Sequence, residues 1–134
     1  MRVLYAVLCE HADERPDGRI DIEGIFHQLY APGFPAQQDR VTLAVVIEWD
    51  AGELGDVHFS IEMLDPSRTP ALSIGGHTEV SEQQLDQGPP QTRILMPIDR
   101  IVFPAEGTYL FELVVGEERQ VIAPLHLIRN GAVN

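Results

Sequence analysis

Residues 41–49 read VTLAVVIEW, and their pattern indicates the fold class. Every second side chain is large and apolar, and in an extended chain these side chains share one face: Val41, Leu43, Val45, Ile47 and Trp49. The same two-residue period recurs in residues 56–64 and 108–115, around Phe59 and Phe111. These three stretches therefore predict strands that send alternate side chains into one shared interior.

Further strands are predicted on both sides of this segment, because extended apolar runs alternate with turn residues. They cover residues 3–10, 19–30, 71–80, 92–98 and 120–128. Residues 15–18, Arg-Pro-Asp-Gly, predict a chain reversal, residues 82–91 predict a loop, and Pro97 points to an edge strand or a bulge. About eight short strands in one domain over residues 1–134 predict an all-β fold, an antiparallel two-sheet immunoglobulin-like sandwich, with a closed barrel as the alternative.

Residues 103–111, FPAEGTYLF, strengthen the sandwich prediction. Gly107 lies two residues before Tyr109, which opens the penultimate predicted strand. This arrangement resembles the tyrosine corner of immunoglobulin-like sandwiches, in which the tyrosine hydroxyl bonds to the chain upstream. The spacing of Cys and Trp found in true immunoglobulin domains is absent, so the resemblance is to the wider class.

Composition excludes several kinds of partner. The formal net charge is −12, and all nine basic residues are Arg, so a phosphate backbone is repelled and no nucleic acid is expected. No apolar run approaches the length of a spanning helix, so no membrane partner is expected. A single cysteine, Cys9, forms no intrachain disulfide, and a cytoplasmic protein is predicted.

Three groups of residues could form a metal site or a catalytic site. His58 and His77 occupy outward positions on two successive predicted strands, where their imidazoles could bind zinc. Cys9 and His11 share one face of an extended chain, where the histidine could activate the thiol as a nucleophile. A loop carries the carboxylates Asp50, Glu53 and Asp56, whose oxygens could bind Ca²⁺. A surface, packing or solvated-loop role is favoured for each set, so no catalytic residue, metal or cofactor is predicted.

Four segments resemble a family of small uncharacterised bacterial proteins. They are VLYAVLCE (3–10), GRIDIEGIF (18–26), FPA (34–36) and FPAEGTYLF (103–111). The resemblance spans nearly the whole chain. It implies a β-sandwich in a bacterial cytoplasm and carries no catalytic residues.

An apolar sheet face is the strongest functional signal in the sequence. If residues 41–49, 108–115 and 120–128 pair with one another, their outward side chains include Ala44, Val46, Leu110, Val114, Ile122 and Pro124. The solvated face of a sheet normally carries polar residues, so a covering element is predicted. The candidates are residues 26–30 and a second subunit.

A non-enzymatic module is therefore predicted, which acts by self-association, as a homodimer, or by binding another protein. The alternative is a small-ligand or carbohydrate-binding module, for which the aromatic candidates are Tyr30, Phe34 and Trp49. An enzyme of unrecognised class is disfavoured, because no nucleophile–base pair is visible in the sequence.

Overall fold

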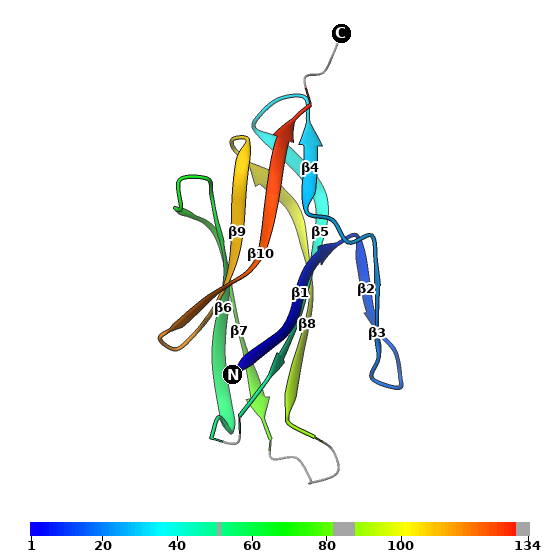
Figure 1. Cartoon of the computed structure of the whole chain (residues 1–134), viewed down its shortest axis with the longest axis vertical. Coiled ribbons are helices and arrows are strands. Elements are labelled where there is room, and N and C mark those ends of the chain that lie inside the picture. The colour runs from blue at the N-terminus through cyan, green and yellow to red at the C-terminus, as the bar shows by residue number, and fades with distance from the viewer. Residues whose placement is uncertain (51, 82–87, 131–134) are drawn as a thin grey trace.

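The computed structural model describes residues 1–50, 52–81 and 88–130. Within these ranges the chain forms ten strands and no helix (Figure 1). They are β1 (Arg2–Cys9), β2 (His11–Glu14), β3 (Ile20–Glu23), β4 (Gln28–Ala31), β5 (Ala36–Glu48), β6 (Gly55–Leu64), β7 (Pro70–Val80), β8 (Gln91–Phe103), β9 (Gly107–Val115) and β10 (Glu118–Arg129). The all-β prediction is confirmed. Most of the predicted loop at 82–91 lies outside the described residues.

The strands form three sheets. A five-stranded sheet has the order β4-β10-β9-β6-β7, a three-stranded sheet has the order β1-β5-β8, and β2 pairs with β3. In Figure 1 the five-stranded sheet lies on the left, the three-stranded sheet lies beside it, and the β2–β3 hairpin lies on the right. The pairings are antiparallel apart from β4 with β10, which is parallel.

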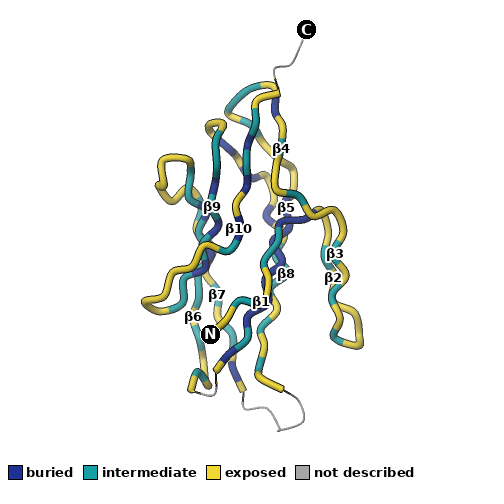
Figure 2. The backbone as a smooth tube through the Cα atoms, viewed as in Figure 1, coloured by how far each residue is buried: buried dark blue, intermediate teal, exposed yellow. Residues whose placement is uncertain are grey.

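The hydrophobic core lies between the two larger sheets. The side chains that alternate inward along residues 41–49 are all at most 2% exposed, as predicted. They pack against inward residues of the five-stranded sheet, which include Ile61, Met63, Phe111, Leu113 and Leu125. Figure 2 shows these buried stretches along β5 and β9. Burial of large aliphatic and aromatic side chains stabilises each strand, at about 1.5–3 kcal/mol per side chain.

The β2–β3 hairpin packs over the outer face of the three-stranded sheet. Its turn matches the predicted reversal, because Gly18 has φ 85° and donates its N–H to the Arg15 carbonyl at 2.9 Å. Residues 11–14, just before that turn, lie in no predicted strand but form β2. Those residues pair with β3, and Ala12 then lies beside Ile22 on the half-buried side of the hairpin.

The predicted strand over residues 19–30 is divided into separate elements. It breaks at Gly24, where φ is 68°, and Phe26 then bridges to Leu8. The chain continues as β4, which adds to the five-stranded sheet beside β10. Pro97 lies in the edge strand β8, as predicted, because a residue without an N–H is tolerated at a sheet edge.

Candidate interaction surface

The residues predicted to share one apolar face lie on two different sheets. β5 pairs with β1 and β8, whereas β9 and β10 belong to the five-stranded sheet. Ala44 and Val46 are therefore separated by the core from Leu110 and Val114, and the prediction of one continuous face is wrong. A two-residue period determines which side chains face the core, but it does not determine which strand lies next in the sheet.

Ala44 and Val46 are covered by the hairpin. Ala44 is 0% and Val46 3% exposed, although both point away from the core. Of the predicted cover, residues 26–30, Phe26 bridges to Leu8 of β1, and residues 28–30 extend the five-stranded sheet at β10. The outer face of β5 is thus buried within the chain, and it offers no surface to a second subunit.

A β-bulge changes the direction of Ile122. The register of β10 against β9 shifts between Val121 and Ala123. Val121 consequently stands opposite Glu112 and is 48% exposed, while Ile122 packs against the core. A bulge inserts one residue into a strand and moves the following side chains to the other face, so the outward position predicted for Ile122 is wrong.

A row of apolar side chains crosses the outer face of the five-stranded sheet. Leu110 of β9 is opposite Pro124 of β10 on one side and Leu64 of β6 on the other, and Leu64 is opposite Pro70 of β7. Their neighbours Met63, Phe111 and Leu125 are buried, so the row itself points outward. We call these four residues the apolar row.

The charged groups beside the apolar row are paired with one another. Arg119 donates hydrogen bonds of 3.0 Å to Glu62 and to Glu112. These bonds raise the pKa of the Arg119 guanidinium, and the bond to Glu62 has the larger effect. Val114 lies directly opposite Arg119 in the register and is half-buried.

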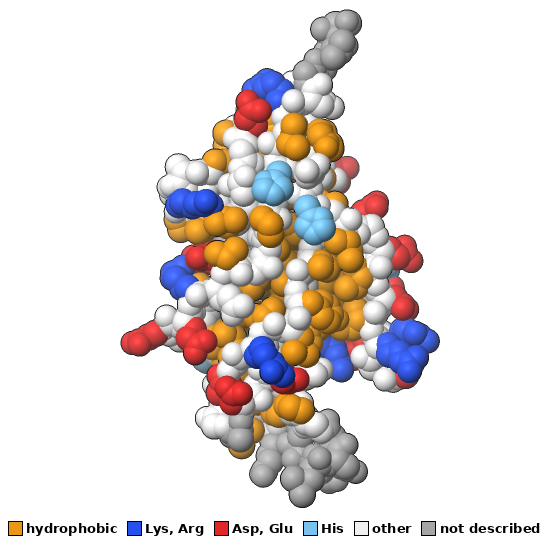
Figure 3. Space-filling view, viewed as in Figure 1, with side chains coloured by type: hydrophobic (Ala, Val, Ile, Leu, Met, Phe, Trp, Pro, Cys, Tyr) orange, Lys and Arg blue, Asp and Glu red, His pale blue; other side chains and the backbone are white. Residues whose placement is uncertain are grey.

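Apolar side chains also show at the open side of the molecule, where β1 and β10 lie next to each other. Figure 3 shows them in a band down the middle of this face, with acidic and basic side chains mostly round its rim. Leu4 is 41% and Tyr5 39% exposed on β1. The surface is therefore apolar on more than one side despite the net charge of −12.

The residues of the predicted tyrosine corner open β9. Gly107 adopts φ 134°, and Tyr109 is fully buried with its ring edge-on to Phe103, at 5.1 Å between centroids. The aromatic residues weighed for ligand binding have separate environments. Trp49 is buried, Tyr30 is 60% exposed, and Phe34 lies under the guanidinium of Arg129.

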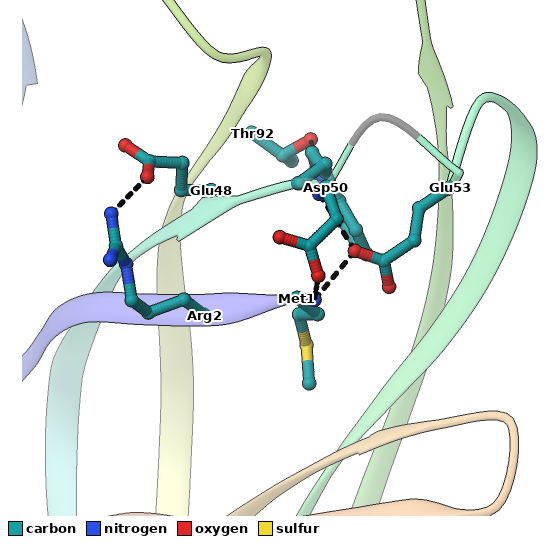
Figure 4. A network of polar contacts seen from close by, with 7 residues as sticks. Met1, Arg2, Glu48, Asp50, Glu53 and Thr92 are labelled. Atoms are coloured by element: carbon teal, nitrogen blue, oxygen red, sulfur yellow. Dashed lines mark hydrogen bonds and ion pairs between the residues drawn. The ribbon is translucent and has the colours of Figure 1, made fainter.

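The loop carboxylates Asp50 and Glu53 converge, but on an ammonium group of the chain (Figure 4). The α-ammonium of Met1 donates to Asp50 Oδ2 at 2.8 Å and to Glu53 Oε1 at 2.5 Å. The hydrogen bond to that ammonium lowers the pKa of Asp50. The third weighed carboxylate, Asp56, lies on β6, with Oδ2 3.8 Å from His58 Nε2. The three carboxylates therefore do not form one oxygen cage.

Cys9 and His11 are not brought together as a nucleophile and a base. Cys9 is 0% exposed and its thiol donates to the Thr42 carbonyl at 3.5 Å. Burial raises the pKa of this thiol, which disfavours the reactive thiolate. His11 is exposed, and its Nε2 lies 2.6 Å from Asp13 Oδ2.

His58 and His77 do stand side by side. They are opposite each other in the β6–β7 register, and their ring centroids are 5.7 Å apart. In the part of the chain that the structure describes, no group of three or more His, Cys, Asp or Glu residues is arranged to hold a metal ion. Among the same residues, no helix has the length and apolar character needed to cross a membrane.

The strand pattern extends over almost the whole chain, and the segments that carry the family resemblance lie near both of its ends. A family of unknown function, DUF6941, has a model that matches residues 4–128. The chain belongs to this family. No curated protein and no solved structure matches the chain. This match confirms the resemblance to a family of uncharacterised proteins, and the family description names no activity.

Proposed function

We propose that this protein is a non-enzymatic, self-associating module, in which two copies pair through the apolar row. The observation that carries the proposal is the in-register alignment of Pro124, Leu110, Leu64 and Pro70 across four neighbouring strands. Where one face of a sheet is open to water, the strands normally carry polar residues on that face. Covering an apolar row on this water-facing side with a second surface is favourable by about 25 cal/mol per Å² of apolar area buried.

A second copy of the chain is the partner that suits this face. A two-fold axis brings the same patch of two subunits together, so a row of apolar residues meets its own equivalent. The neighbouring Arg119 is already hydrogen-bonded to Glu62 and Glu112, so part of the local negative charge is neutralised. Repulsion between two acidic subunits is consequently weaker at this face than the net charge suggests.

The proposed setting is a bacterial cytoplasm, and the proposed architecture is an immunoglobulin-like sandwich. The buried thiol of Cys9, the one cysteine, is compatible with a reducing compartment. The facing five- and three-stranded sheets and the buried Tyr109 at the start of β9 support the sandwich. A non-enzymatic role is supported by the Cys9 thiol, whose burial opposes its ionisation.

Sedimentation velocity over a range of protein concentrations tests the proposal. The wild-type protein is expected to shift from monomer to dimer as concentration rises. Leu110→Glu and Leu64→Glu, tested separately, place a charge in the row and should leave a monomer. Val102→Glu is the matched control, because Val102 is a 50% exposed apolar residue on β8 in the other sheet, and it should dimerise like the wild type.

Circular dichroism of each variant shows whether the fold is retained. A wild-type protein that stays monomeric at the highest concentration would refute self-association. Equal dimerisation of the two row variants and the wild type would refute the assignment of the surface.

A further inference from the structure

A pocket lies between the tip of the β2–β3 hairpin and the outer face of the three-stranded sheet. Three residues in one register row line it from the sheet: Tyr5 of β1, Val46 of β5 and Arg93 of β8. The hairpin contributes residues 15 and 18–21. The pocket has a volume of about 420 Å³, which is enough for a small organic molecule.

The residues that line this pocket carry a net positive charge, whereas the whole protein is acidic. Arg15, Arg19 and Arg93 line it, which is three of the nine basic residues in a chain of net charge −12. Asp21 is the acidic residue among its lining residues. Guanidinium groups are the side chains that best bind carboxylates and phosphates, because their planar N–H donors match those oxygens.

The carboxylates near these arginines hold them loosely. The nitrogen–oxygen distances are 3.7 Å for Arg15–Asp17, 3.8 Å for Arg15–Asp21 and 3.6 Å for Arg93–Glu14, all longer than a hydrogen bond. Within the described residues, no ion pair involves Arg19. The guanidinium N–H groups around the pocket therefore remain available to a ligand.

Two arginines elsewhere on the protein, Arg40 and Arg119, are bound more closely. Arg40 lies 2.6 Å from Asp99, and Arg119 lies 3.0 Å from each of two glutamates. Their N–H groups are already used in hydrogen bonds within the chain. By contrast, the three arginines that gather at this one pocket have, among the residues that the structure describes, no carboxylate within hydrogen-bond distance of their guanidinium groups.

The remaining lining residues are largely apolar. Leu4 and Tyr5 are 41% and 39% exposed, and Ile20 is half-buried above the buried Val46. An aromatic or aliphatic body placed here would cover apolar surface that water now contacts. We propose that this pocket binds a small organic anion, an oxyanion attached to an apolar body, with Arg15, Arg19 and Arg93 contacting the oxyanion.

An NMR titration with phenyl phosphate tests this inference. Saturable shifts of the backbone amide signals are expected in residues 15, 17–21 and 91–93. Benzoate tests a carboxylate on the same ring and should shift the same signals. Benzylamine keeps the ring but reverses the charge, and inorganic phosphate lacks the apolar body, so both should bind at least about tenfold more weakly than phenyl phosphate.

Two variants and one control assign the binding to the pocket. Arg19→Gln and Arg93→Gln should each weaken phenyl phosphate binding at least about tenfold, the loss expected for one charged hydrogen bond. Arg68→Gln removes an exposed arginine from the β6–β7 turn and should leave the affinity unchanged. Retained dispersion of the amide signals shows that each variant is folded.

Three results would overturn the inference. They are shifts that do not saturate, equal binding of benzylamine, and an Arg68→Gln variant that loses as much affinity as the pocket variants. The pocket lies on the three-stranded sheet, away from the apolar row. Its binding can therefore fail while self-association succeeds, or the reverse.

Discussion

The hydroxyl of Tyr109 and the backbone of Ala105 are joined by two hydrogen bonds. The hydroxyl donates to the Ala105 carbonyl at 2.7 Å and accepts the Ala105 N–H at 3.1 Å. The ring is meanwhile buried against Phe103. The turn between β8 and β9 is therefore anchored to the core by one side chain, with the hydrogen-bond pattern of a tyrosine corner.

Replacement Tyr109→Phe should destabilise the fold by about 1–3 kcal/mol. It keeps the buried ring but removes both hydrogen bonds to Ala105. Urea denaturation followed by circular dichroism measures the change. Tyr30→Phe is the matched control, because that hydroxyl belongs to an exposed residue and donates its hydrogen bond to Gln28. If both variants lose the same stability, the two bonds contribute nothing measurable.

The contribution of the Tyr109 hydroxyl should disappear at alkaline pH. Burial raises the pKa of Tyr109 above its usual value of about 10. A group whose pKa is raised on folding contributes stability that is complete below the unfolded pKa and is lost as pH rises through the folded pKa.

The stability difference between wild type and Tyr109→Phe should thus be constant from pH 7 to about 9 and narrow above about 10. Denaturation series at several pH values measure this difference. The Cys9 thiol is present in both proteins and cancels. A difference that widened with pH would contradict the assignment.

A hydrogen-bonded chain links the two larger sheets at one edge. The indole Nε1 of Trp49 donates to Thr92 Oγ1 on β8 at 2.8 Å, and that oxygen lies 3.1 Å from Thr78 Oγ1 on β7. Thr92→Val leaves the buried indole N–H without its acceptor and should cost about 1–3 kcal/mol.

Thr78→Val is the control, because it preserves the acceptor of Trp49 and should cost less. Thermal unfolding followed by fluorescence reports directly on this site, since Trp49 is the one tryptophan. A larger loss of stability for Thr78→Val than for Thr92→Val would show that the hydrogen bond from the indole is not the important link.

Gly107→Ala should destabilise the protein by about 1–3 kcal/mol. The residue has φ 134°, which side chains other than glycine rarely adopt, and an added Cβ would lie 2.8 Å from Cγ of Pro66. Gly75→Ala is the control, since its Cβ would lie 3.9 Å from the nearest atom, the Phe59 carbonyl oxygen. Alanine suits a strand better than glycine, so this control should be neutral or slightly stabilising in calorimetry.

Local patterns in the sequence predicted much of the fold. The alternation around Leu43, Phe59 and Phe111 correctly predicts three core strands, because every second residue of an extended chain faces one side. The turn at Gly18 was also visible, since glycine adopts a positive φ without strain. Strand β2 was missed because its four residues contain one apolar side chain and pair only with β3.

The candidate surface was predicted only in part. Leu110 and Val114 do face outward on the five-stranded sheet, whereas Ala44 and Val46 lie under the hairpin. No local signal marked the bulge beside Ile122, which depends on how β10 aligns with β9. The cluster of Arg15, Arg19 and Arg93 could likewise not be predicted, because Arg93 lies more than 70 residues along the chain from the other two.

The amino-acid sequence by itself determined which faces of the strands are apolar, where the chain turns, and the negative charge of the whole. Only the tertiary structure decided that β5 lies between β1 and β8, that a hairpin covers its outer face, and that an apolar row remains open on the other sheet. The reason is physical. Side-chain burial follows a local two-residue period, whereas the hydrogen bonds that choose neighbouring strands join backbone groups that every residue type shares.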